Sequence, residues 1–71
     1  MMYKWRLEYL LKNGSRIVGM YMGEEKDSSS VANKLMVGPL NGFVATFGQD
    51  EQHNLLVMRG EIAAVDISEW R

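Results

Sequence analysis

The sequence predicts an α+β fold: a single domain over residues 1–71 with the element order ββαβββ, built on a strongly bent antiparallel sheet or a small open barrel. Three observations predict it. Polar and apolar side chains alternate over residues 3–11, which is the period of a β-strand. Apolar residues recur at helical spacing over residues 28–37. Turn signals that contain glycine divide the remainder into short segments rich in β-branched and aromatic residues.

The first two strands are predicted over residues 3–11 and 15–22, joined by a hairpin turn. Asn13-Gly14 favours a two-residue turn of type I′, because both central residues of that turn need a positive φ. The cross-strand pairs would then be Leu10 with Ile17, Tyr9 with Val18, Leu7 with Met20 and Trp5 with Met22. One face would be apolar and form the core, with Trp5, Leu7, Tyr9, Leu11, Val18, Met20 and Met22. The opposite face would hold a smaller apolar patch of Leu10, Ile17 and Tyr21.

One helix and three further strands follow the first hairpin. Asp27 or one of the serines after it would cap the helix, and Gly38-Pro39 would end it. A helix of two to three turns is unstable alone, so its apolar stripe is expected to cover one face of the sheet. The later strands are predicted over residues 43–47, 55–58 and 61–67, with Arg59-Gly60 as a tight turn or a sharp bend.

The charge balance excludes a protein that binds nucleic acid or a membrane by electrostatics alone. Eight basic and nine acidic residues leave a net charge of −1 at pH 7. The N-terminal residues alternate and do not form the apolar stretch of a signal peptide, and the chain has no cysteine. We therefore expect a cytoplasmic protein that has no membrane partner.

The sequence carries little that could perform catalysis. His53 lies in a polar loop with Asp50, Glu51 and Gln52, where an acid/base pair can be imagined, but a solvated loop is favoured. One histidine and no cysteine cannot supply the three or four ligands that zinc requires. The glycines are too scattered for a phosphate-binding loop. We expect a protein that is not an enzyme and that has no catalytic residue, no cofactor, no metal and no small-molecule substrate.

Two segments resemble the Sm-like family of small, strongly bent five-stranded sheets. Residues 11–19, Leu-Lys-Asn-Gly-Ser-Arg-Ile-Val-Gly, are similar to the first hairpin of that family. Residues 57–65, which begin Val-Met-Arg-Gly, are similar to its second motif, in which a hydrophobic pair precedes Arg-Gly. The resemblance implies a ring of subunits that binds single-stranded RNA, with Arg59 facing a bound base. The N-terminal cations Lys4, Arg6 and Arg16 would complete the RNA contact.

The function expected from the residues themselves is that of a small interaction or assembly module, of the kind found as an accessory component in bacteria or their phages. A domain this small has only a small free energy of unfolding. Without disulfides or a metal site, association with another chain is the main way in which it can gain stability. Self-association could use an exposed strand edge or the patch of Leu10, Ile17 and Tyr21. Trp70 would fold back on the sheet or contact another subunit. The alternative is an Sm-like ring subunit that binds single-stranded RNA.

Overall fold

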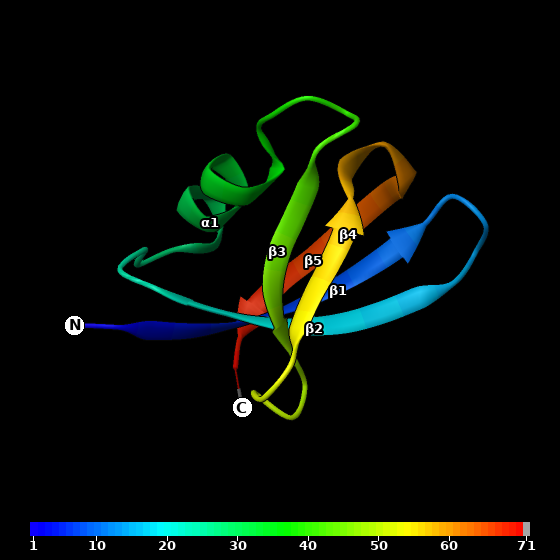
Figure 1. Ribbon diagram of the computed structural model, residues 1–71. Coiled ribbons are helices and arrows are strands. Elements are labelled where there is room, and N and C mark those ends of the chain that lie inside the picture. Colours follow the sequence, from blue (N-terminus) through cyan, green and yellow to red (C-terminus); the bar gives the residue numbers. More distant parts are fainter. Residues whose placement is uncertain (71) are drawn as a thin grey trace.

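Five antiparallel strands and one helix make up this computed structural model, which describes residues 1–70 (Figure 1). The elements in chain order are β1 (Tyr3–Leu11), β2 (Arg16–Gly23), α1 (Ser28–Met36), β3 (Phe43–Gly48), β4 (Asn54–Met58), a short 3-10 helix (Arg59–Glu61) and β5 (Ile62–Glu69). Their order in the sheet is β4-β3-β2-β1-β5, so β4 and β5 are the two edges and the sheet is open. The α+β class predicted from the sequence is confirmed in this form.

The first hairpin forms where it was predicted, but its register differs by one residue. Tyr9 lies opposite Ile17, and Trp5 lies opposite Tyr21. The Leu11 N–H donates to the Ser15 carbonyl (2.8 Å), and the Gly14 N–H donates to the Leu11 carbonyl (2.9 Å). Of the two turn residues, Gly14 alone takes a positive φ, of 90°. The loop is therefore longer than a type I′ turn and needs one left-handed residue instead of two.

The shift in register moves every β2 side chain to the face opposite the predicted one, because side chains alternate along a strand. The β1 half of the predicted core is confirmed, since Trp5, Leu7 and Tyr9 are buried. The β2 half is wrong: Val18, Met20 and Met22 lie on the outer face, opposite Glu8, Arg6 and Lys4 of β1. Met20 is nevertheless buried there, in register between Arg6 on β1 and Phe47 on β3.

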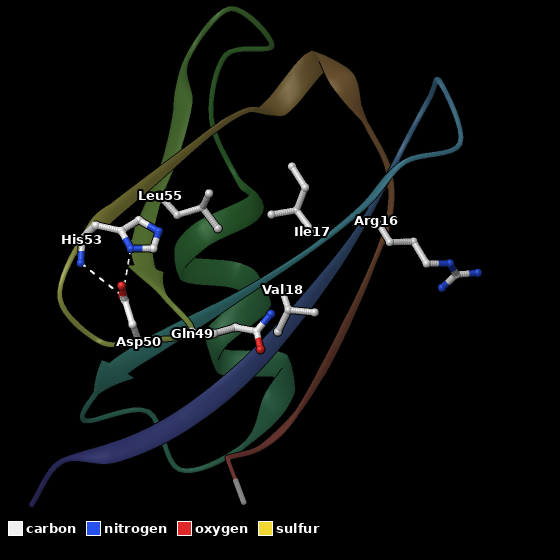
Figure 2. Close-up of a pocket in the computed structure, with 7 residues that line it drawn as sticks. All are labelled: Arg16, Ile17, Val18, Gln49, Asp50, His53 and Leu55. Carbon is white, nitrogen blue, oxygen red and sulfur yellow. Dashed lines mark hydrogen bonds and ion pairs between the residues drawn. The ribbon is translucent and has the colours of Figure 1, made fainter.

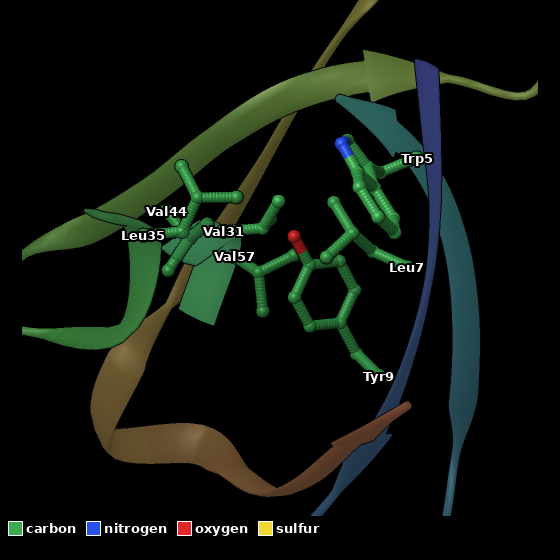
Figure 3. Packing of buried hydrophobic residues seen from close by; sticks show 7 residues of the cluster. All are labelled: Trp5, Leu7, Tyr9, Val31, Leu35, Val44 and Val57. Carbon is green, nitrogen blue, oxygen red and sulfur yellow. The ribbon is translucent and has the colours of Figure 1, made fainter. Parts of the chain in front are cut away.

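The helix covers the inner face of the sheet, as its apolar stripe requires. Its N-cap is Asp27, whose Oδ1 accepts a hydrogen bond from the Ser30 N–H at 2.8 Å. Val31 and Leu35 on α1 pack against Val44 on β3 and Val57 on β4, over the β1 side chains (Figure 3). The Trp5 indole N–H donates to the Glu25 carbonyl (3.1 Å) and so fixes the segment that leads into the helix. One continuous core therefore joins the helix to both hairpins.

The two halves of the sheet are joined by a short contact between β2 and β3. Only Gly19 with Gly48 and Met20 with Phe47 are paired there. Beyond these pairs the β3–β4 hairpin runs steeply across β1 and β2 (Figure 1). A Cβ at Gly19 would lie 2.8 Å from Leu55 Cδ2 and 2.9 Å from Thr46 Oγ1. A side chain at position 19 would therefore displace Leu55 and Thr46, and glycine avoids this overlap at the bend.

The last strand is longer than its sequence pattern predicts. β5 pairs with β1 as far as Trp5 opposite Glu69, and the Trp70 N–H then donates to the Lys4 carbonyl at 3.1 Å. The predicted strand ended at residue 67, because Ser68 and Glu69 are polar. They continue the strand since exposed positions at a sheet edge accept polar side chains. Trp70, which is partly buried, continues the pairing of β5 with β1 through this backbone bond, and its contact with another subunit stays a prediction.

Replacing Gly14 with valine should lower the free energy of unfolding by about 2 kcal/mol, because a β-branched residue resists positive φ. The space around position 14 is open, so the loss would come from the backbone alone. Urea denaturation of Gly14→Val and Gly14→Asn measures it. The asparagine variant should lose much less, since asparagine tolerates the left-handed region. Equal stability of Gly14→Val and the wild type would contradict the loop geometry described above.

Candidate interaction surface

The structure does not bring together the residues predicted to form an interaction patch. Ile17 and Tyr21 lie on the inner face and pack against the core. Leu10 lies on the outer face, where its strand neighbours are Arg16 and Ala64. Trp70 follows the end of β5 beside Lys4. The patch of Leu10, Ile17 and Tyr21 was a consequence of the type I′ register, and it disappears with that register.

Tyr21 has a structural partner instead of an external one. Its hydroxyl donates to Glu25 Oε1 at 2.6 Å, which closes the segment between β2 and α1. Burial raises the pKa of the Tyr21 phenol to about 12, and the adjacent Glu25 carboxylate contributes to the same shift. The hydrogen bond from Tyr21 is in turn the main reason that the pKa of Glu25 is lowered.

The four cations of the RNA interpretation each contact an acceptor within the protein. Lys4 pairs with Glu51 at 2.8 Å. Arg6 and Arg16 both pair with Glu8, at 3.2 and 3.3 Å, and these hydrogen bonds, that of Arg6 first, lower the pKa of Glu8. All three pairs are solvated and contribute little to stability.

Arg59 occupies a different place from the other three cations. Its Nε–H donates to the Leu35 carbonyl (3.1 Å) in the last turn of α1, where a cation complements the helix dipole. A Cβ at Gly38 or at Gly42 would lie within 2.8 Å of the guanidinium group. The side chain is thus enclosed between the helix end and the loop before β3, and its role as an RNA contact stays a prediction.

His53 and Asp50 lie beside a shallow pocket between β2 and the β3–β4 loop (Figure 2). The pocket is lined by Arg16, Ile17, Val18, Gln49, Asp50, His53 and Leu55. His53 Nδ1 lies 2.8 Å from Asp50 Oδ1, and both side chains are more than half exposed. The pKa of Asp50 is lowered by the backbone N–H of Gln52 first and by His53 second. No serine, threonine or cysteine side chain lines the pocket.

Residues 1–70 contain no group of three or more histidine, cysteine, aspartate or glutamate side chains placed to hold a metal ion. They also contain no helix that is both long and apolar enough to cross a membrane.

The largest concentration of exposed apolar side chains lies on the outer face of the β3–β4 hairpin. Phe43, Phe47, Leu56 and Met58 are 54%, 40%, 59% and 39% exposed. Ala45, also exposed, lies between the two phenylalanines and opposite Leu56. We call these five residues, Phe43, Ala45, Phe47, Leu56 and Met58, the outer apolar face. Burial alternates along β3, so Val44 and Thr46 point into the core while the outer apolar face points to solvent.

Two further large apolar side chains are exposed outside the hairpin. Val37 and Leu40, in the loop after α1, are 71% and 72% exposed. The Gly60 N–H donates to the Leu40 carbonyl (2.8 Å), which ties the backbone of this loop to the segment after β4.

This surface was not predicted from the sequence. A signal was present in the sequence: no charged residue occurs between Lys34 and Asp50, and none occurs in residues 54–58. Charged residues usually occur on solvated strand faces, so two adjacent strands without any charge are an indication of a partner.

No family model, no curated protein and no solved structure matches this chain. The function must therefore be inferred from its own surfaces.

The stability of the folded protein at high pH should depend on the ionisation of Tyr21. Its pKa in the folded state lies near 12, above its ordinary value near 10, so the protein is fully stabilised by the neutral phenol below pH 10. That contribution is lost as the pH rises from 10 to 12. Titration of tyrosinate absorbance should show two phenols ionising late, because burial also raises the pKa of Tyr9, and the variant Glu25→Gln should advance one of them, Tyr21. A late titration unchanged by Glu25→Gln would contradict the role given to the Glu25 carboxylate.

Proposed function

We propose that this protein is a non-enzymatic assembly module that associates with itself through the outer apolar face. The observation that carries the proposal is the concentration of exposed apolar side chains on two adjacent strands, β3 and β4, that carry no charged residue. Such a face is costly to expose to water, and burying it against another chain recovers the hydrophobic free energy.

The size of the surface supports the proposal. If a large apolar side chain has about 200 Å² of surface, the exposed parts of Phe43, Phe47, Leu56 and Met58 provide on the order of 400 Å². A stable interface buries about 800 Å² on each partner, of which somewhat more than half is apolar. The outer apolar face thus supplies most of the apolar surface that association needs.

The edge of the sheet supports the proposal as well. β4 is an edge strand, and residues 54–58 contain no charge and no proline. Natural proteins usually protect an edge strand with lysine, proline or a bulge, because its free N–H and C=O groups can pair with another chain. At the opposite edge, β5 carries Asp66 and Glu69 and has a register shift against β1. The unprotected edge and the apolar face therefore belong to the same hairpin.

The absence of enzymatic activity is part of the proposal and rests on the shallow pocket beside His53. Catalytic acids and bases usually lie in enclosed sites, where burial shifts their pKa values. Asp50 and His53 are solvated, and the pKa of Asp50 is lowered by local hydrogen bonds that are typical of a tight turn. This arrangement favours a structural role for the pair.

The alternative of an Sm-like ring subunit that binds single-stranded RNA has less support. RNA sites combine cations with stacked aromatic side chains. Here Lys4, Arg6 and Arg16 pair with carboxylates, and no cation belongs to the outer apolar face, where the exposed phenylalanines lie. A ring of five to seven chains in solution, with RNA binding that is lost in Arg59→Ala, would favour this alternative over the proposal.

The test of self-association is sedimentation of the wild type and of Leu56→Lys over a range of concentrations. The wild type should associate in the micromolar range, and Leu56→Lys should weaken association at least about tenfold, because it places a charge in an apolar contact. Ala64→Lys adds the same charge at an exposed position of β5 and should change little. A wild type that remains a folded monomer at about 100 μM, with a melting temperature independent of concentration, would contradict the proposal.

A further inference from the structure

We infer that the assembly is a dimer in which two outer apolar faces pack against each other about a two-fold axis parallel to β3 and β4, so that Leu56 lies over Ala45 of the partner subunit. This inference rests on the proposed function, because it specifies the partner and the geometry at the same surface. The partner is a second copy of this chain.

The first argument is the shape of the outer apolar face. Ala45 and Leu56 are directly opposite each other at the middle of the hairpin. Ala45 is a small residue between the larger Phe43 and Phe47, so the surface is low at this point. Leu56 is 59% exposed and rises beside it. The face thus contains one low position and one raised position side by side, which is the arrangement that a second copy of the same face can complement.

The direction of the axis follows from the strand register. Rotation by 180° about an axis between β3 and β4 and parallel to them places each β3 over β4 of the other copy. Leu56 then meets Ala45 of the partner subunit, and Ala45 meets Leu56 of the partner subunit, as a closed two-fold interface requires. Phe43 meets Met58 of the partner subunit, a favourable contact between sulfur and an aromatic ring.

An axis perpendicular to the strands fits less well. When that axis crosses the middle of the hairpin, the rotation places β4 over β4 of the second copy, with Leu56 against Leu56 of the partner subunit. Two raised side chains would then collide at the centre, and two Ala45 residues would leave a void beside them. Voids and collisions both weaken an interface, so the parallel axis is favoured.

The charge and the exposed area of the outer apolar face both fit a second copy of this chain as the partner. The hairpin strands carry no charged side chain over residues 43–48 and 54–58, so two identical faces meet without repulsion between like charges. A partner with a strongly charged surface would lose the hydration of its charges there. The exposed side chains of the outer apolar face provide on the order of 400 Å² per copy, close to the apolar share of one side of a stable interface.

Pairing of two β4 edges is the other contact that the hairpin could make with a copy of itself. It would satisfy backbone groups, but it would leave Phe43 and Phe47 facing solvent on the same side of a longer sheet. Packing of the two faces covers both rings. The exposure of these rings in the single chain therefore favours the packed arrangement.

The test exchanges the large side chain at position 56 with the small side chain at position 45. Ala45→Leu should weaken dimerisation about tenfold, because Leu56 of the partner subunit no longer finds a low position. Leu56→Ala should weaken it by a similar factor, since the raised side chain is lost. The double variant Ala45→Leu/Leu56→Ala restores one raised and one low position on each copy, and its dissociation constant should return toward the wild-type value. Sedimentation equilibrium gives the constants, and urea denaturation confirms that each variant is folded.

The possible results distinguish failure of this dimer geometry from failure of the proposed self-association. Ala45→Leu makes the face more apolar, so unspecific hydrophobic association would become tighter; that result would overturn the inference and leave self-association intact. Failure of the double variant to recover, or a wild-type assembly larger than two chains, would also overturn the packed dimer alone. A wild type that is monomeric at about 100 μM would overturn the proposed function together with the inference.

Discussion

The close approach of the two hairpins at Gly19 is the constraint on which the rest of this structure depends. Neighbouring strands in a sheet lie about 5 Å apart, so β2 and β4, separated by β3, would be about 10 Å apart in a flat sheet. Leu55 on β4 nevertheless reaches to within 2.8 Å of where a Cβ at Gly19 would stand. Thr46 Oγ1 and the Phe47 carbonyl lie at 2.9 and 3.1 Å from the same point. A glycine on β2 therefore permits the sheet to fold over its own inner face.

The bend decides both what is buried and what is exposed. On the inner side, it brings Val44 and Val57 over the β1 residues, and α1 then fills the remaining space with Val31 and Leu35. The chain thus encloses a hydrophobic core although its sheet stays open and does not form a closed barrel. On the outer side, the same bend turns one whole face of the β3–β4 hairpin toward solvent, where no element of residues 1–70 covers Phe43 or Leu56. The exposed face is thus a consequence of how the core is built.

Local patterns predicted the elements well, because each depends on residues close together in the chain. The alternation in residues 3–11 gave β1 and the burial of Trp5, Leu7 and Tyr9. The N-cap is Asp27, one of the capping residues that the sequence offered together with the serines after it, and the end of the helix before Gly38-Pro39 was predicted correctly. The hairpin register was not, because Asn13-Gly14 is compatible with more than one loop length, and a slip of one residue reverses a strand.

The candidate surface could be predicted only in part. The uncharged character of residues 35–49 is visible in the sequence, but β3 has apolar residues at nearly every position, so its pattern does not say which side faces inward. That choice is made by contacts distant in sequence, between Val44 on β3 and Val31 on α1, and by the bend at Gly19. Leu10, Ile17 and Tyr21 were selected by a register that the longer loop changes.

The free energy of unfolding of Gly19→Ala, measured in the wild-type and Leu55→Ala backgrounds, tests the role of this constraint most directly. If the bend requires the close approach, the added methyl should cost about 1–3 kcal/mol in the wild type, as overpacking does elsewhere. It should cost less in Leu55→Ala, where the nearest contact has been removed. A Gly19→Ala variant as stable as the wild type, or a loss unchanged by Leu55→Ala, would contradict the account.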